Sequence, residues 1–141
     1  MDYREYSKDL LSRKKHLASA YASLNAEIEM LEREKTACKV AASNNGDERL
    51  YEERLIGILA DLEDCRFRRS VVERELIKIE KGMNVLSDYY RDVLERLFVE
   101  RESDAVEYLM TKWYKERATV YRDRTRALED FTRSVYGVVQ L

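Results

Sequence analysis

The residues best suited to chemistry with a partner are arginines and lysines clustered near the C-terminus. Residues 112–126 hold six basic and two acidic side chains, a local excess of four positive charges in a chain whose formal net charge is −2. The basic side chains are Lys112, Lys115, Arg117, Arg122, Arg124 and Arg126. A helix that concentrates arginine and follows a shorter helix has the charge and shape needed to read a DNA major groove. The cluster therefore predicts a DNA-binding helix.

Other kinds of reactive site are poorly represented in the sequence. The chain has one histidine, His16, and two cysteines, Cys38 and Cys65, which form no zinc-binding pattern of ordinary spacing. It contains no glycine-rich phosphate loop and no nucleophile elbow. The many carboxylates fall on the expected exposed faces of helices. We therefore expect a protein that is not an enzyme, with no catalytic residue, no metal site and no cofactor.

The composition predicts an all-α fold. The 141 residues include no proline and four glycines, and 38% of them are charged, which is typical of long helices with solvated flanks. A pI near 5.6 argues against nonspecific coating of nucleic acid, but a local basic surface still allows a specific contact. The sequence has no run of about 18 apolar residues and no apolar signal-peptide core. We expect a cytoplasmic protein with no membrane partner.

The N-terminal half carries two apolar patterns whose alternating steps of three and four residues are typical of a coiled-coil seam. The first pattern consists of Leu10, Leu17, Leu24, Leu31 and Cys38, with Tyr21 and Ile28 between them and Lys14 and Lys35 as interruptions. The second consists of Leu55, Ile58, Leu62, Cys65, Val72, Leu76 and Ile79, interrupted by Arg69. Residues 43–47 between the two patterns favour a turn, and Asp47 is expected to cap the second helix.

A short connection makes two long helices antiparallel neighbours, so residues 1–81 are expected to form a helical hairpin that turns near residue 45. In such a hairpin Cys38 lies beside residues near 52 and Cys65 beside residues near 25, too far apart for a disulfide. An isolated hairpin that buries only one apolar stripe per helix is marginally stable. We therefore expect the hairpin to pack on a partner. That partner is the C-terminal part of the chain or, as the favoured alternative, a second copy in a homo-oligomer.

Residues 82–141 are expected to form a separate bundle of shorter helices. Gly82 suits the C-cap of the second long helix. Ser87 suits the N-cap of a new helix that runs to about Arg101. The bundle therefore begins close to residue 82, directly after the hairpin.

Two more helices are expected in this bundle. Asp104 and Glu107 have the spacing of a capping box, which predicts the start of a helix. The last helix is expected to begin near Glu116 and to end by Gly137. The tail from Val138 to Leu141 is expected to be loose.

Parts of the bundle follow the order of a known helix-turn-helix module. Residues 86–98 consist of a leading leucine, Leu86, and an expected helix, and residues 118–128 include the run Thr-Val-Tyr-Arg and end in Ala-Leu. The segment Leu86–Phe131 resembles region 4 of bacterial sigma factors. With its long helical N-terminal half and its Val135-Tyr136-Gly137 ending, the chain is similar to the ArpU/RinA-type phage transcriptional regulators. The resemblance implies sequence-specific binding of double-stranded DNA, activation of phage late genes in a bacterial host cell, and contact with host RNA polymerase.

The resemblance also implies which side chains face DNA. Carried over onto this sequence, the DNA-facing positions are Arg117, Ala118, Tyr121 and Arg122. Arg117 and Arg122 are expected to contact base edges, because arginine pairs bidentately with guanine. Other side chains are expected to position the helix through phosphates. These are Lys115, Arg124 and Arg126, together with Thr119, which would contact a phosphate or a thymine methyl group.

Two residues of the turn depart from the pattern of that module. Tyr114 stands where glycine is usual, and Glu116 stands where a serine or threonine cap is usual. A tyrosine in a left-handed conformation is strained by about 1 kcal/mol or more. We expect Trp113, Val120 and Leu128 to hold the two helices on either side of this turn together.

The same sequence is open to a second class of function. An arginine-rich helical face is often only a solvated surface. Asp123, Glu129 and Asp130 would repel phosphates unless they lie on the opposite face or pair with arginines. The apolar heptads also suit a coiled-coil interaction scaffold, or a phage assembly component related to the small terminase subunit. Binding to mixed-sequence DNA separates the two classes, because a scaffold would show only weak, salt-sensitive association.

Overall fold

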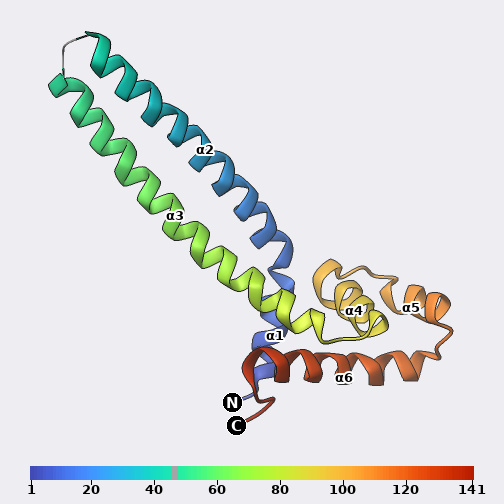
Figure 1. The fold of residues 1–141 in the computed structure, drawn as a ribbon. Coiled ribbons are helices and arrows are strands. Elements are labelled where there is room, and N and C mark those ends of the chain that lie inside the picture. The colour runs from blue at the N-terminus through green and yellow to red at the C-terminus, as the bar shows by residue number, and fades with distance from the viewer. Residues whose placement is uncertain (46–47) are drawn as a thin grey trace. The chain divides into compact units, whose positions relative to one another are not determined.

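The computed structural model describes residues 1–45 and 48–141, and within these ranges the fold is all-α, as predicted (Figure 1). The elements in chain order are α1 Tyr3–Ser12, α2 Lys14–Asn45, α3 Glu48–Asn84, α4 Asp88–Leu94, the π-helix η1 Glu95–Glu100, α5 Ala105–Trp113 and α6 Arg117–Tyr136. Asp47, the expected cap of the second long helix, lies outside the described residues.

The chain divides into two compact units. One, the bundle unit, combines Met1–Leu17 with Glu75–Leu141, and the other, the hairpin unit, is Ala18–Arg74. This division differs from the predicted boundary between residues 1–81 and 82–141. The reason is that apolar side chains of α1 and of the end of α3 are buried with the C-terminal helices rather than in the hairpin.

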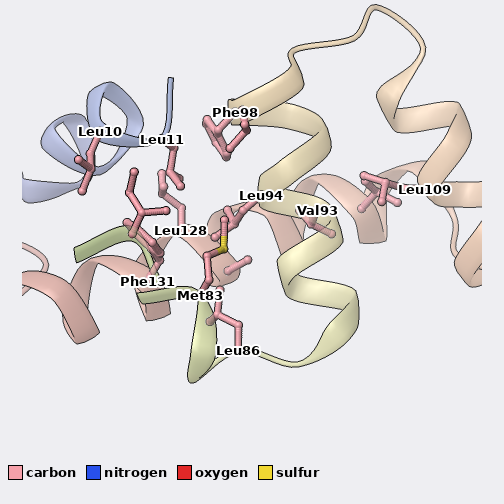
Figure 2. Close-up of a cluster of buried hydrophobic side chains, with 14 residues drawn as sticks. Leu10, Leu11, Met83, Leu86, Val93, Leu94, Phe98, Leu109, Leu128 and Phe131 are labelled. Atoms are coloured by element: carbon pink, nitrogen blue, oxygen red, sulfur yellow. The ribbon is translucent and has the colours of Figure 1, made fainter. Parts of the chain in front are cut away.

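The core of the bundle unit draws side chains from each of its helices (Figure 2). Its buried members are Leu10, Leu11, Ile79, Met83, Leu86, Val93, Leu94, Phe98, Val99, Leu109, Val120, Ala127, Leu128 and Phe131. Leu10 and Ile79 were expected in the hairpin seam, but the structure buries both in this cluster. The first helix ends at Ser12, which allows α1 to pack on α6 and η1 as a separate element.

The hairpin unit is an antiparallel pair formed by α2 and α3, as predicted. The Cys38 thiol lies 3.3 Å from the carbonyl oxygen of Tyr51, and the Arg69 guanidinium donates to Asn25 Oδ1 over 3.0 Å. From the first pair to the second, the residue number falls from 38 to 25 along α2 and rises from 51 to 69 along α3, so the two helices are antiparallel. The second pair also gives Arg69, which interrupts the seam, a hydrogen-bonding partner across it. The buried core consists of Ile28, Leu31, Cys38, Ile58, Leu62 and Cys65.

Gly82 is not the helix cap that the sequence suggested, because α3 continues through it to Asn84. A Cβ at position 82 would lie 2.5 Å from Phe131 Cδ2 and 2.7 Å from Val135 Cγ2. Only glycine therefore allows α3 to approach α6 this closely. The next predicted cap is confirmed, since Ser87 Oγ accepts from the backbone N–H of Tyr90 over 3.2 Å.

The C-terminal tail is paired with the N-terminus, so the expectation of a loose tail is wrong. The Tyr3 N–H donates to the carbonyl of Val139 over 2.9 Å, and the Leu141 N–H donates to that of Met1 over 3.0 Å. Asp2 and Gln140 form an isolated antiparallel bridge between these two bonds. The two ends of the chain are far apart in the sequence, so no local pattern in the tail predicts that they pair.

Candidate nucleic-acid interface

A tight turn joins α5 to α6, at the place where the sequence predicted it (Figure 1). Tyr114 ends α5 in the left-handed conformation, with φ 54° and ψ 48°, and its side chain is 94% exposed. The Lys115 N–H donates back to the carbonyl of Met110 over 3.1 Å. Glu116 then takes the N-cap position of α6 without a side-chain capping bond. Backbone hydrogen bonding therefore maintains the turn despite the strain at a non-glycine residue.

The predicted capping box at the start of α5 does not form. Asp104 occupies the N-cap position, but its side chain makes no capping hydrogen bond. Glu107 is instead paired with Arg117 across the turn, at 2.7 Å from Nη2 to Oε1. The carboxylate that local spacing assigned to the helix start thus lies beside the first residue of α6.

A polar network attaches the end of α5 to α4. Trp113 Nε1 donates to Asp92 Oδ2 over 2.8 Å, and Lys112 Nζ lies 3.1 Å from the same oxygen. Arg96 approaches the other carboxylate oxygen at 3.4 Å. Burial alone would raise the pKa of Asp92, but these hydrogen bonds and the nearby cations hold it below its ordinary value. Lys112 therefore serves an internal contact, although the sequence counted it in the basic cluster.

A partly buried hydrogen bond joins Asp123 of α6 to Tyr89 of α4. Asp123 is 8% exposed and accepts from the Tyr89 hydroxyl over 2.8 Å. The pKa of Tyr89 lies well above its ordinary value, mainly because the hydroxyl is removed from water and secondly because it donates to a carboxylate. Val120 and Ala127 are fully buried on the same side of the helix. With Asp123 turned inward, the opposite side of the first turns of α6 faces solvent.

The side chains predicted to face DNA lie on that outer side. Arg117, Ala118, Tyr121 and Arg122 are all exposed. Steps of three and four residues place Ala118, Tyr121 and Arg122 next to one another on one helix face. Two other acids of α6 are paired with cations, Glu129 with Arg4 and Asp130 with Arg133.

The residues predicted to contact phosphates are more dispersed. Lys115 is exposed, with Nζ 5.2 Å from the centre of the Tyr89 ring. Arg126 is exposed, and Thr119 is half-buried. Arg124 departs furthest from the cluster. It is half-buried, with its guanidinium 5.1 Å from the centre of the Phe98 ring.

The two arginines expected to read bases differ in their surroundings. Arg117 is held by Glu107, whereas Arg122 makes no ion pair with any residue that the structure describes. Within the same described part, Thr125 is a further exposed member of the face, one turn beyond Tyr121 and Arg122. Helical spacing alone could have identified Thr125. The Glu107 contact spans ten residues across a turn, so no local pattern indicates it.

Over residues 1–45 and 48–141, no group of three or more histidine, cysteine or acidic side chains is arranged to hold a metal ion. Cys38 and Cys65 are buried free thiols, and burial raises the pKa of Cys65. In the same part of the chain, no helix combines the length and apolar character needed to cross a membrane.

Comparison of the chain with protein-family models, curated proteins and solved structures gives no match. The resemblance to sigma-factor region 4 and to the ArpU/RinA-type regulators therefore stays a prediction from the residues quoted above. The case for a function depends on the geometry of α5, the turn and α6.

Proposed function

We propose that the protein is a sequence-specific DNA-binding transcription regulator that reads a major groove with the first turns of α6. The observation that carries this proposal is the outward face of α6, where two arginines, a tyrosine and an alanine are exposed while Asp123 is buried. Arginine offers a fixed fork of donors to guanine. Tyrosine can contact a base or a phosphate, and alanine allows close approach to a thymine methyl group.

The regulator would act by recruitment and not by chemistry. On this proposal the bundle unit binds a promoter or an upstream site, and the protein contacts host RNA polymerase to activate phage late genes in the bacterial cytoplasm. The support for DNA binding is local charge, because the whole chain is slightly acidic and only the field near the phosphates matters for the contact.

The test is selection of bound sequences from random duplex DNA, with the purified wild-type chain and with Arg117 and Arg122 both changed to alanine. A DNA motif enriched by the wild type and lost in the double variant supports the proposal. The single variant Arg122→Ala should lower affinity for that motif by about 1–3 kcal/mol. Arg133→Ala is a matched control, because it removes an exposed arginine near the end of the same helix. Equal loss in both single variants would contradict the assigned face.

A specific observation favours a second candidate, an interaction scaffold built on the hairpin unit. Ile56 and Phe67 are each 67% exposed on α3, and Val71 is exposed one turn beyond Phe67. Helical spacing places these side chains opposite the buried stripe of Ile58, Leu62 and Cys65. We infer that this face contacts a second copy of the chain, which makes the two candidates compatible in one protein.

Sedimentation velocity over a range of concentrations tests the second candidate. Phe67→Gln should shift the protein toward monomer. Val85→Gln, which removes an apolar side chain that is 65% exposed in the bundle unit, should leave the distribution unchanged. A wild-type chain that stays monomeric at all concentrations would rule out self-association through this face.

A further inference from the structure

The ion pair between Glu107 and Arg117 joins two exposed side chains of the bundle unit. The two side chains are 55% and 53% exposed, and water screens a pair of this kind, so it contributes little to stability. Glu107 lies in the first turn of α5, and Arg117 is the first residue of α6. The pair therefore joins the two helices at the surface that would approach DNA.

The contact restricts the guanidinium of Arg117. Glu107 Oε1 lies 2.7 Å from Nη2 of Arg117. This hydrogen bond is the largest cause of the raised pKa of Arg117. Arginine is charged at any physiological pH, so the consequence of the pair is orientation. Because a guanidinium has five N–H donors, the donors that Glu107 does not use stay free for a base edge.

A carboxylate at this position also acts on DNA directly. Nonspecific binding depends almost entirely on cations that replace counterions at the phosphates. Glu107 weakens nonspecific binding, because it neutralises the charge of Arg117 and places a negative charge next to the backbone of any duplex. A guanine edge that pairs with a correctly oriented Arg117 offsets this penalty, whereas a noncognate sequence does not.

We propose that Glu107 is a specificity-determining positioning residue, which orients Arg117 toward a base edge and weakens the binding of noncognate DNA. This inference rests on the proposed DNA-binding function and adds a residue of α5 to the reading surface. Arg122 has no such partner among the described residues, so its expected contact with a base edge does not depend on a neighbouring carboxylate.

The test uses Glu107→Gln in the full-length chain, with fluorescence anisotropy on the selected motif and on a scrambled duplex at several salt concentrations. The variant should bind the scrambled duplex several-fold more tightly, with a log–log salt slope steeper by about one unit. The ratio of motif to scrambled affinity should fall by about tenfold. Glu5→Gln is the matched control, because Glu5 is an exposed glutamate paired with Lys8 on α1. It should leave both affinities unchanged.

A double-mutant cycle shows whether Glu107 acts through Arg117. In the Arg117→Ala background, Glu107→Gln should change the affinity ratio by less than twofold. A full tenfold effect in that background would overturn the positioning role. An unchanged ratio in the single variant would overturn the inference and leave the proposed function intact, provided that the wild type still selects its motif. A folded wild type that selects no motif would overturn the proposed function and the inference with it.

Discussion

Replacing Gly82 with alanine tests the close approach of α3 to α6. Alanine inside a helix ordinarily stabilises it by about 0.5–1 kcal/mol relative to glycine. Here the added Cβ would lie 2.5 Å from Phe131 Cδ2 and 2.7 Å from Val135 Cγ2. Phe131 is fully buried, so its ring cannot swing out into solvent to make room. Overpacking a core by a methyl group costs about 1–3 kcal/mol. After the helix gain is subtracted, we expect a net destabilisation of about 1 kcal/mol, within a range of about 0–2.5 kcal/mol.

Urea unfolding monitored by the fluorescence of Trp113 provides the assay, because this is the single tryptophan and it lies in the bundle unit. Gly57→Ala is the internal control. Gly57 lies in the same helix, in the hairpin unit, and an added Cβ there meets nothing within 4 Å. Followed by circular dichroism, it should stabilise the hairpin by about 0.5–1 kcal/mol. If Gly82→Ala unfolds at the same urea concentration as the wild type or a higher one, the packing argument is refuted.

Two further predictions concern tyrosines of the bundle unit. Tyr89→Phe leaves the buried carboxylate of Asp123 without its donor and should cost about 1–3 kcal/mol in urea unfolding. Folding raises the pKa of Tyr89, so the stability that its neutral hydroxyl contributes is complete below the unfolded-state pKa near 10. That stability is lost as pH rises above this value, and the Tyr89→Phe variant should not show this loss at alkaline pH. Tyr114→Gly relieves a left-handed tyrosine and should raise the thermal midpoint, with a gain of about 1 kcal/mol. An unchanged or lower midpoint would show that Tyr114 is not strained.

Much of the architecture could be predicted because its causes are local. Apolar side chains repeating every three and four residues require helices that bury one stripe. Together with the short connection between the two helices, this repeat predicts the antiparallel pairing of α2 with α3. The caps at Ser87 and Gly137 were also predictable, since a hydroxyl before a helix and a glycine after it satisfy nearby backbone groups. The DNA-facing positions of α6 came from the resemblance to sigma-factor region 4, and the structure leaves all four of them exposed.

The errors arose where distant segments compete for the same residue. The heptad position of Leu10 was read correctly as buried, but the periodicity cannot say which partner buries it. Gly82 resembled a cap because a sequence does not show Phe131 and Val135 against it. Glu107 resembled half of a capping box because its spacing to Asp104 is local, whereas Arg117 lies beyond a turn.

The sequence by itself determined the all-α class, the two long helices of the hairpin and the basic character of the last helix, because each depends on neighbours within one or two helical turns. Only the tertiary structure decided that α1 packs in the bundle unit, that Asp123 is turned inward to Tyr89, and that Arg117 is held while Arg122 has no ion-pair partner among the described residues. These features depend on which helices pack together. That choice is made by burial and hydrogen bonding summed over the whole unit, which local spacing does not encode.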